Sequence, residues 1–190
     1  MLEQLLQYDT ELFLFLNNLG STTYDNIWLI ITNKLTSIPL YALLLYFIYR
    51  HLGWRTLLFL VVIIVLLITF TDQVTNVFKH GIKRPRPCRA EEIEDLVRFI
   101  APRCGRYGFF SGHSSNSMAV AVFAGLLLRP YYKHLIFMLL FWSAIVAYSR
   151  IYVGVHYPLD IISGMTFGAL SGYIFFKLQE LLRKRFSFFS

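Results

Sequence analysis

An arginine, a histidine and an aspartate lie close together at Arg150, His156 and Asp160, between two strongly apolar segments. Charged side chains in such surroundings are costly and usually serve a function. A neutral imidazole can attack a phosphorus atom, a carboxylate one helical turn further on can hold its ring in the required tautomer, and a guanidinium can bind phosphate oxygens. This triplet predicts phosphoryl transfer with His156 as the nucleophile and Asp160 as its partner.

Two further polar clusters could complete such a site. Lys79 and Arg86 are seven residues apart in the segment KHGIKRPRP, so on a helix both face the same way. His113 stands at the start of an apolar helix, where a second imidazole can protonate a leaving alkoxide and then activate water. We expect phosphate to be bound by these cations, by a hydroxyl and by a backbone amide at the helix N-terminus. The predicted phosphate-binding residues are Lys79, Arg86, Ser111, Gly112 and Arg150. With this many fixed cations, no metal or cofactor is required.

Lys83 and Arg84 compete with Arg86 for the phosphate role. Only Arg86 both lies seven residues after Lys79 and directly precedes Pro87. We therefore assign the phosphate contact to Arg86.

The order and spacing of the three clusters resemble the signature motifs of the type-2 phosphatidic acid phosphatase family, whose site is shared by the vanadium haloperoxidases. The matching residues are Lys79-x6-Arg86-Pro87, Ser111-Gly112-His113 and Ser149-Arg150-x5-His156-x3-Asp160. The resemblance implies the roles given above and a bundle of membrane helices. One position departs from the family pattern, because Phe110 stands where a proline usually precedes the serine; this removes no catalytic group.

The composition indicates an integral membrane protein. Of 190 residues, 56% are hydrophobic and 15% are charged, and a soluble domain of this size cannot hide so much apolar surface. The net charge of +7 is explained better by anionic lipid head groups than by nucleic acid, because the basic residues cluster at helix ends and in one loop. The acidic N-terminal segment lacks the basic start of a cleavable signal peptide. The oligomeric state is left open.

The hydropathy pattern predicts an all-α fold, a polytopic membrane helix bundle of about five transmembrane helices in one domain, residues 1–190. Residues 1–20 are expected to form an amphipathic helix at the membrane interface. Residues 85–110 form the one substantial loop. The expected spans cover residues 24–50, 54–84, 111–129, 134–152 and 158–182. Lys34 and Pro39 are expected to interrupt the first, with its early part at the interface and its later part deep in the membrane.

Five spans place all three clusters on one face of the membrane. The opposite face has short, basic turns and the N-terminal segment is acidic, which favours an active face outside the cytoplasm of a bacterial inner membrane, towards the periplasm or the cell exterior. Cys88 and Cys104 are the only cysteines and both lie in the loop. An oxidising compartment favours a disulfide between them, and two free thiols are the alternative.

The sequence therefore predicts a lipid phosphate phosphatase that acts through a phosphohistidine at the outer membrane interface. The candidate substrates are polyprenyl diphosphate, phosphatidylglycerol phosphate, phosphatidic acid and lipid A phosphate. One alternative is a phosphotransferase that passes the group to a lipid or sugar acceptor. A second alternative, from another class, is a non-enzymatic anion transporter.

Overall fold

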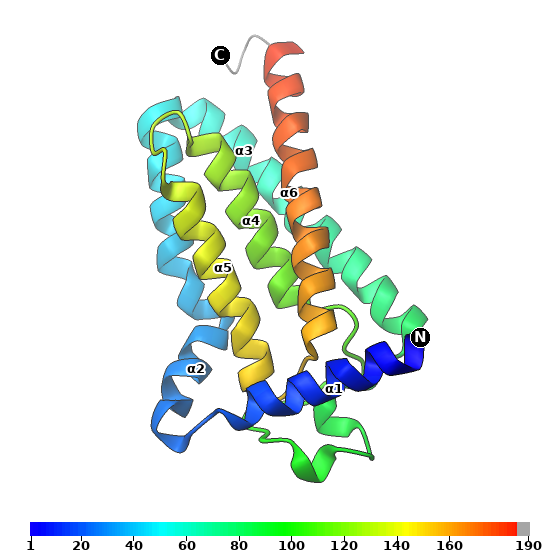
Figure 1. Cartoon of the computed structure of the whole chain (residues 1–190). Coiled ribbons are helices and arrows are strands. Elements are labelled where there is room, and N and C mark those ends of the chain that lie inside the picture. Colours follow the sequence, from blue (N-terminus) through cyan, green and yellow to red (C-terminus); the bar gives the residue numbers. More distant parts are fainter. Residues whose placement is uncertain (186–190) are drawn as a thin grey trace.

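The computed structural model describes residues 1–185 and consists of helices, short connections and one long loop (Figure 1). No strand occurs in this part of the chain, which confirms the predicted all-α class. Residues 186–190 of the predicted domain lie outside the described range. The α-helices are α1 (Leu2–Asn18), α2 (Asp25–Thr32), α3 (Ile38–Ile82), α4 (Gly112–Leu128), α5 (Leu135–Tyr152) and α6 (Pro158–Arg185). Short 3₁₀ helices cover Thr22–Tyr24, Lys34–Ser37, Pro87–Arg89 and Glu94–Leu96.

Helix α3 consists of two limbs that run in opposite directions (Figure 1). The chain reverses at Gly53, whose φ of +78° interrupts the helix. This left-handed conformation is open to glycine at little cost but strains residues with a Cβ. The two limbs together with α4, α5 and α6 form a bundle of five long helical segments, where about five transmembrane helices were predicted.

Helix α4 lies at the centre of the bundle, and α6 packs tightly against it. Small residues of α4, including Ser115 and Ala119, are fully buried. Three glycines of α6 spaced by four residues face this side of α4. A Cβ at Gly164 would lie 2.6 Å from the carbonyl oxygen of Ser111, the residue before α4, and a Cβ at Gly172 would lie 2.5 Å from that of Ala119. Such small-residue contacts allow two helix backbones to approach closely in lipid. The pair carries Gly112 and His113 of the second cluster on α4 and Asp160 of the third cluster on α6.

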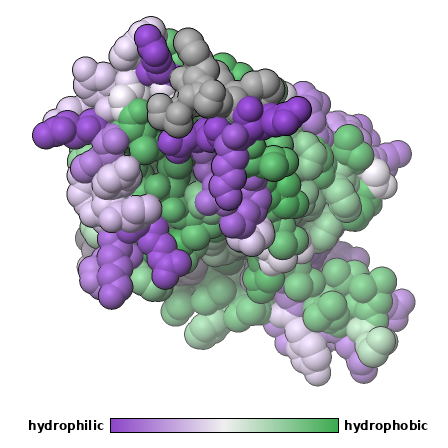
Figure 2. All heavy atoms as spheres, turned by 90° about the horizontal axis from the view of Figure 1, so that it is seen from above, coloured by the Kyte–Doolittle hydropathy of each residue, from purple (hydrophilic) through white to green (hydrophobic). Residues whose placement is uncertain are grey.

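The outer surface of the bundle is apolar. Three helical segments are long and apolar enough to cross a membrane, namely Lys34–Ile82, Leu135–Tyr152 and Pro158–Arg185, and α4 with 17 residues is about 25 Å long. Figure 2 looks onto the end opposite the loop and shows hydrophilic side chains gathered there beside hydrophobic flanks. Exposed large side chains on these flanks include Val62, Phe137, Phe141, Leu170 and Ile174. Apolar flanks of this kind suit contact with lipid chains.

Helix α1 lies across the loop end of the bundle and is amphipathic, as predicted (Figure 1). Its outer leucines are exposed, whereas Asp9, Phe13 and Asn17, spaced by four residues, are buried. The Asn17 side chain donates hydrogen bonds of 3.0 Å to the carbonyls of Ile151 and Tyr152 at the end of α5. Helix α1 is therefore fastened to the junction between α5 and α6.

The predicted first span, residues 24–50, is interrupted in the region expected from Lys34 and Pro39. Helix α2 ends at Thr32, and Asn33 is extended and accepts a hydrogen bond from the Leu35 amide. The membrane limb begins only at Ile38, with Pro39 in its first turn. The interruption has a local cause, because asparagine favours caps and turns and proline is tolerated only at a helix start. The predicted second span ends at Ile82, two residues early, because Lys83 is left-handed.

Candidate active site

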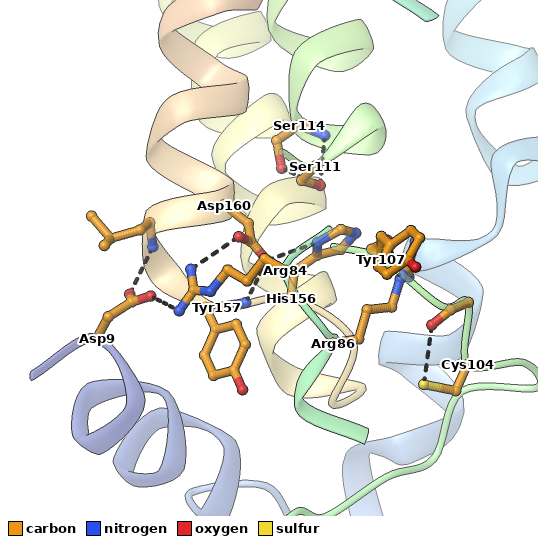
Figure 3. A network of polar contacts seen from close by, with 12 residues as sticks. Asp9, Arg84, Arg86, Cys104, Tyr107, Ser111, Ser114, His156, Tyr157 and Asp160 are labelled. Carbon is orange, nitrogen blue, oxygen red and sulfur yellow. Dashed lines mark hydrogen bonds and ion pairs between the residues drawn. The ribbon is translucent and has the colours of Figure 1, made fainter. Parts of the chain in front are cut away.

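His156 and Asp160 form a hydrogen-bonded pair at the junction of α5 and α6 (Figure 3). His156 lies in the connection and Asp160 in the first turn of α6, and the four-residue spacing brings Nδ1 within 3.2 Å of Oδ2. The same carboxylate oxygen accepts the Tyr157 backbone N–H at 3.1 Å. Both side chains are buried. When Nδ1 donates to the carboxylate, Nε2 is the basic nitrogen that can act on a substrate.

The backbone of the long loop closes over this pair. A Cβ at Gly108 would lie 2.9 Å from the Asp160 Oδ2 atom and 3.7 Å from the His156 Nδ1 atom. The Ser111 amide donates to the Asp160 carbonyl at 3.0 Å. A side chain at position 108 would therefore disturb the pair, whereas glycine lets the loop support it directly.

A cavity of about 630 Å³ opens beside His156. Its wall is built by the end of α2 and the segment that follows it, both limbs of α3, the long loop, and helices α4 and α5. The structure thus brings six of the eight predicted catalytic and phosphate-binding residues to one space. These are Lys79, Arg86, Gly112, His113, Arg150 and His156.

Four cationic residues line this wall, namely Lys34 and the three predicted phosphate-binding cations Lys79, Arg86 and Arg150. Among residues 1–185, none of Lys79, Arg86 and Arg150 takes part in an ion pair. Arg150 is buried, donates to the Thr32 hydroxyl, and keeps its Nε atom without a hydrogen-bond partner among the described residues. Buried cations need counter-charge, so this arrangement suits an anion with several oxygens.

Backbone contacts position two of these cations. A Cβ at Gly112 would lie 3.6 Å from the Lys79 Nζ atom, which places the ammonium against the first turn of α4. The free N–H groups of such a turn also attract anions. Arg86 donates from Nε to the Tyr107 carbonyl at 3.0 Å. The loop thereby holds Arg86 in place and leaves the rest of its guanidinium for another partner.

The cavity continues from the cations into the apolar interior of the bundle. Asp72 and Asn116 stand in the wall, where the Asn116 amide donates to the Asp72 carboxylate at 2.8 Å. The apolar part is lined by side chains of α3, α4 and α5, including Leu44, Ile48, Leu67, Phe123 and Trp142. The space is therefore charged at one end and apolar at the other.

Ser111 and Asp160 are the two predicted residues that do not form the cavity wall. Ser111 caps α4: its hydroxyl accepts hydrogen bonds from the amide and the hydroxyl of Ser114, at 3.4 and 3.0 Å. Its backbone amide donates to the backbone carbonyl of Asp160, as described above. In this structure Ser111 orients the first turn of α4, while the Gly112 backbone faces the cavity.

Several residues near the site were given no functional role from the sequence, among them Arg84, which was considered for the phosphate contact and set aside in favour of Arg86. Arg84 points away from the phosphate-binding cations and contacts Asp9 and Asp160 (Figure 3). Thr32 and Lys34, from the segment around the end of α2, contribute to the cavity wall. The only sequence signal for Asp9 is the four-residue spacing of a polar residue with Phe13 and Asn17 on one face of α1.

Cys88 and Cys104 are bonded to each other in the structure, with their Cα atoms 6.3 Å apart. The bond joins two parts of the long loop, one next to Arg86 and one next to Gly105. A Cβ at Gly105 would lie 3.2 Å from the Arg86 guanidinium. The disulfide therefore braces the segment that holds Arg86.

The surroundings of His156 keep its imidazole neutral. Burial lowers the pKa of His156 well below its ordinary value of 6.5, and the charges of Arg86, Arg150 and Lys79 act in the same direction. A hydrogen bond to the Gly108 backbone opposes these effects. A neutral imidazole is the form that can act as a nucleophile.

The family model described as the PAP2 superfamily matches residues 55–184, which include every residue of the site except those contributed by the N-terminal 54. The chain belongs to the PAP2 superfamily. This confirms the resemblance drawn from the three motifs, and the chain is a membrane phosphatase of that superfamily. The assignment of individual catalytic roles remains a proposal.

Similar PAP2 proteins agree with this placement. The chain is 36% identical to a lipid A 4'-phosphatase of Bacteroides thetaiotaomicron over 97% of its own length and 83% of the relative's. It is 32% identical to a lipid A 4'-phosphatase of Porphyromonas gingivalis, over 97% of this chain and 78% of the other. Among solved structures, Aquifex aeolicus LpxE has a TM-score of 0.69 at 25% identity, covering 88% of this chain and 93% of that one.

Proposed function

We propose that this PAP2 protein hydrolyses the phosphate of a membrane lipid head group through a phosphohistidine, without a metal. The observation that carries the proposal is the arrangement around His156. Its ring contacts Asp160 and borders a cavity whose predicted phosphate-binding cations, Lys79, Arg86 and Arg150, form no ion pair among the described residues. The apolar continuation of that cavity suits a lipid. Soluble phosphate esters would not need it.

The chemistry follows from the positions of the side chains. The Nε2 atom of His156 attacks phosphorus, and the bond between phosphorus and the lipid oxygen breaks. The departing oxygen takes a proton from His113, while the cations and the α4 amides bind the charged phosphate oxygens. Asp160 stabilises the charge that develops on the imidazole. Water, deprotonated by His113, then attacks the phosphohistidine and releases inorganic phosphate.

The preferred substrate class is lipid A carrying a 4'-phosphate. The two lipid A 4'-phosphatases named above align with 97% of this chain. A second candidate is polyprenyl diphosphate, because an undecaprenyl-diphosphatase of Sulfolobus acidocaldarius is 27% identical over 94% of the chain. Both substrates join a phosphate to a large apolar body, so the cavity alone does not separate them.

The site is proposed to face the outside of the bacterial cytoplasmic membrane. The Cys88–Cys104 bond lies at the same end of the bundle as His156, and disulfides persist in oxidising compartments. Short basic turns at the opposite end suit the cytoplasm. We also propose that the whole chain forms a single domain and that α1 lies at the outer membrane interface.

The test is phosphate release by detergent-purified protein in EDTA, beside His156→Ala. The panel contains bis-phosphorylated lipid A, undecaprenyl diphosphate, phosphatidic acid and phosphatidylglycerol phosphate. We expect release from lipid A at the 4' position, a fall of about 10⁴-fold or more in the variant, and an acid-labile phosphate on wild-type protein only. A circular dichroism spectrum and a disulfide like those of wild type establish that the variant is folded.

Other results would favour the alternatives. Phosphate transfer that requires an added lipid or sugar acceptor would indicate a phosphotransferase. Absence of release, together with phosphate uptake into proteoliposomes that persists in His156→Ala, would indicate a transporter. Release abolished by EDTA and restored by a divalent cation would contradict the metal-independent mechanism.

A further inference from the structure

We propose that Asp9 and Arg84 are positioning residues that hold Asp160, and through it His156, so that docking of α1 is part of the active site. The proposal rests on the proposed role of His156 as the nucleophile. It assigns a function to the N-terminal helix, which lies outside the stretch matched by the family model.

The geometry of Arg84 is that of a bridge between two carboxylates (Figure 3). One terminal nitrogen donates to Asp160 Oδ1 at 3.1 Å, and the other donates to Asp9 Oδ2 at 2.6 Å. The guanidinium lies over the ring of Tyr157, 3.9 Å from its centroid. The Arg84 side chain is 15% exposed and the two carboxylates 2% and 0%. A planar fork with two donors fits this task, and a lysine ammonium does not.

Asp9 binds the same turn of α6 a second time. Its Oδ1 atom accepts the Leu159 backbone N–H at 2.8 Å, next to Asp160 in the chain. Four residues along α1, Phe13 packs edge-on against Tyr157 with ring centroids 5.3 Å apart. Helix α1 thus contacts Tyr157 and Leu159, two of the three residues that lie between His156 and Asp160 in the chain.

The two carboxylate oxygens of Asp160 have different partners, and this division gives Arg84 a role in holding the carboxylate. Oδ2 faces His156 and the Tyr157 amide, and Oδ1 faces Arg84. The charged or titratable groups around this carboxylate are His156, Tyr157, Arg84, Arg86 and Asp9. Of these, Arg84 is the only cation in ion-pair contact with it among residues 1–185. A buried carboxylate that loses its cation binds a proton more readily, and the protonated group holds the imidazole less well.

Arg84 and Arg86 differ in what they face, although one residue separates them. Arg86 is part of the cavity wall, whereas Arg84 is not. The N–H groups of Arg84 are directed to protein carboxylates. We therefore expect its loss to slow the chemical step without weakening substrate binding.

The experiment compares Asp9→Asn, Arg84→Gln and Arg84→Lys in the full-length protein with wild type, His156→Ala and the control Asp25→Asn. Asp25 is a matched control because it also joins the N-terminal segment to a loop arginine, Arg98, at 2.5 Å, but does not contact Asp160. Values of kcat and KM are measured over pH 4.5 to 9 with the substrate preferred in the panel. Folding is checked by gel filtration and by the disulfide.

We expect Arg84→Gln to lower kcat about 100-fold, as small displacements of catalytic groups do, with KM within about 3-fold of wild type. The acid limb of its kcat profile should move to higher pH. Arg84→Lys should lower kcat but leave the acid limb of the kcat–pH profile where it is in wild type. Asp9→Asn should lower kcat about 10-fold. Asp25→Asn should change kcat less than about 3-fold, because its ion pair is partly solvated.

Three results would overturn the proposal. A raised KM with unchanged kcat in Arg84→Gln would make Arg84 a substrate ligand. Equal losses in Asp9→Asn and Asp25→Asn would show a general disturbance of the N-terminal segment, and wild-type kcat in Asp9→Asn would remove α1 from the mechanism. If Arg84→Gln does not fold, Arg84→Lys and Asp9→Asn decide alone. Activity in His156→Ala would contradict the proposed function instead, whatever the other variants show.

Discussion

The two sides of His156 are built differently. On the α1 side, every charge has a partner: Arg84 lies between Asp9 and Asp160, and Asp160 also faces His156. On the cavity side, Lys79, Arg86 and Arg150 face one space with no ion pair among the described residues. Each side contains arginine, but only on the α1 side does the arginine form ion pairs with carboxylates.

This difference indicates that the residues on the α1 side position His156, whereas the cations on the cavity side bind phosphate. A cation already neutralised by protein carboxylates has little to gain from an incoming phosphate, whereas a buried cation without such a partner has much to gain. The comparison predicts that variants on the cavity side weaken phosphate binding and that variants on the α1 side slow the chemical step.

The largest effect is expected on the cavity side at Arg150. Arg150→Ala should lower kcat/KM by about 10² to 10³-fold, as removal of a preorganised donor to a charged transition state does. Steady-state phosphate release measures it, with exposed Arg129→Ala at the opposite end of the bundle as control. A variant that retains more than half of wild-type kcat/KM would show that Arg150 does not bind the reacting phosphate.

Loss of the disulfide should affect the binding of substrate on the cavity side and leave the α1 side unchanged. Replacing Cys88 and Cys104 by alanine should destabilise the protein by about 3 kcal/mol on the chain-entropy model. Because the bond braces the segment around Arg86, KM should rise more than kcat falls. Thermal unfolding in detergent measures the loss of stability, and steady-state kinetics measure the change in KM and kcat. Wild-type protein with the disulfide intact is compared with reduced wild-type protein as a control that needs no substitution. Equal melting temperatures for that pair would remove the disulfide from the stability of the fold.

Binding of inorganic phosphate, measured as a shift in melting temperature, should distinguish the two sides of His156 without any catalytic step. A ligand at 100 times its Kd stabilises the folded state by about 2.7 kcal/mol, and we expect phosphate to raise the melting temperature of wild type and of Asp9→Asn. Arg150→Ala should lose the shift. Chloride at equal ionic strength is the control. A shift retained in Arg150→Ala and lost in Asp9→Asn would reverse the assignment of the two sides.

The smallest effect is expected from acid pH. The lowered pKa of His156 keeps the nucleophile neutral below pH 6.5, so its protonation should not reduce kcat/KM between pH 7 and 6. Stability should nevertheless fall as pH drops below 6.5, because the unfolded chain then binds a proton at this histidine that the folded chain does not. Kinetics and thermal unfolding in wild type and His156→Asn test this; an equal pH dependence of melting in both would contradict it.

Much of the site could be predicted because its chemistry is encoded locally. The spacing from Arg150 to His156 and Asp160 spans a helix end, a connection and one helical turn, and the structure places His156 and Asp160 in contact as that spacing requires. The apolar runs likewise predicted the bundle. The interruption after Thr32 was only partly anticipated, since a cap at Asn33 and a proline at position 39 compete with an otherwise apolar segment.

The amino-acid sequence alone predicted a lipid phosphatase in a membrane and proposed the residues that bind phosphate, because side-chain type and helical periodicity are local properties. Packing decided the rest. Asp9 lies 151 positions before Asp160, and only the docking of α1 across the α5–α6 junction brings Arg84 between them. The roles of Arg84 and Arg86 differ for the same reason: two arginines of one segment face opposite sides, and the partners on each side come from distant parts of the chain.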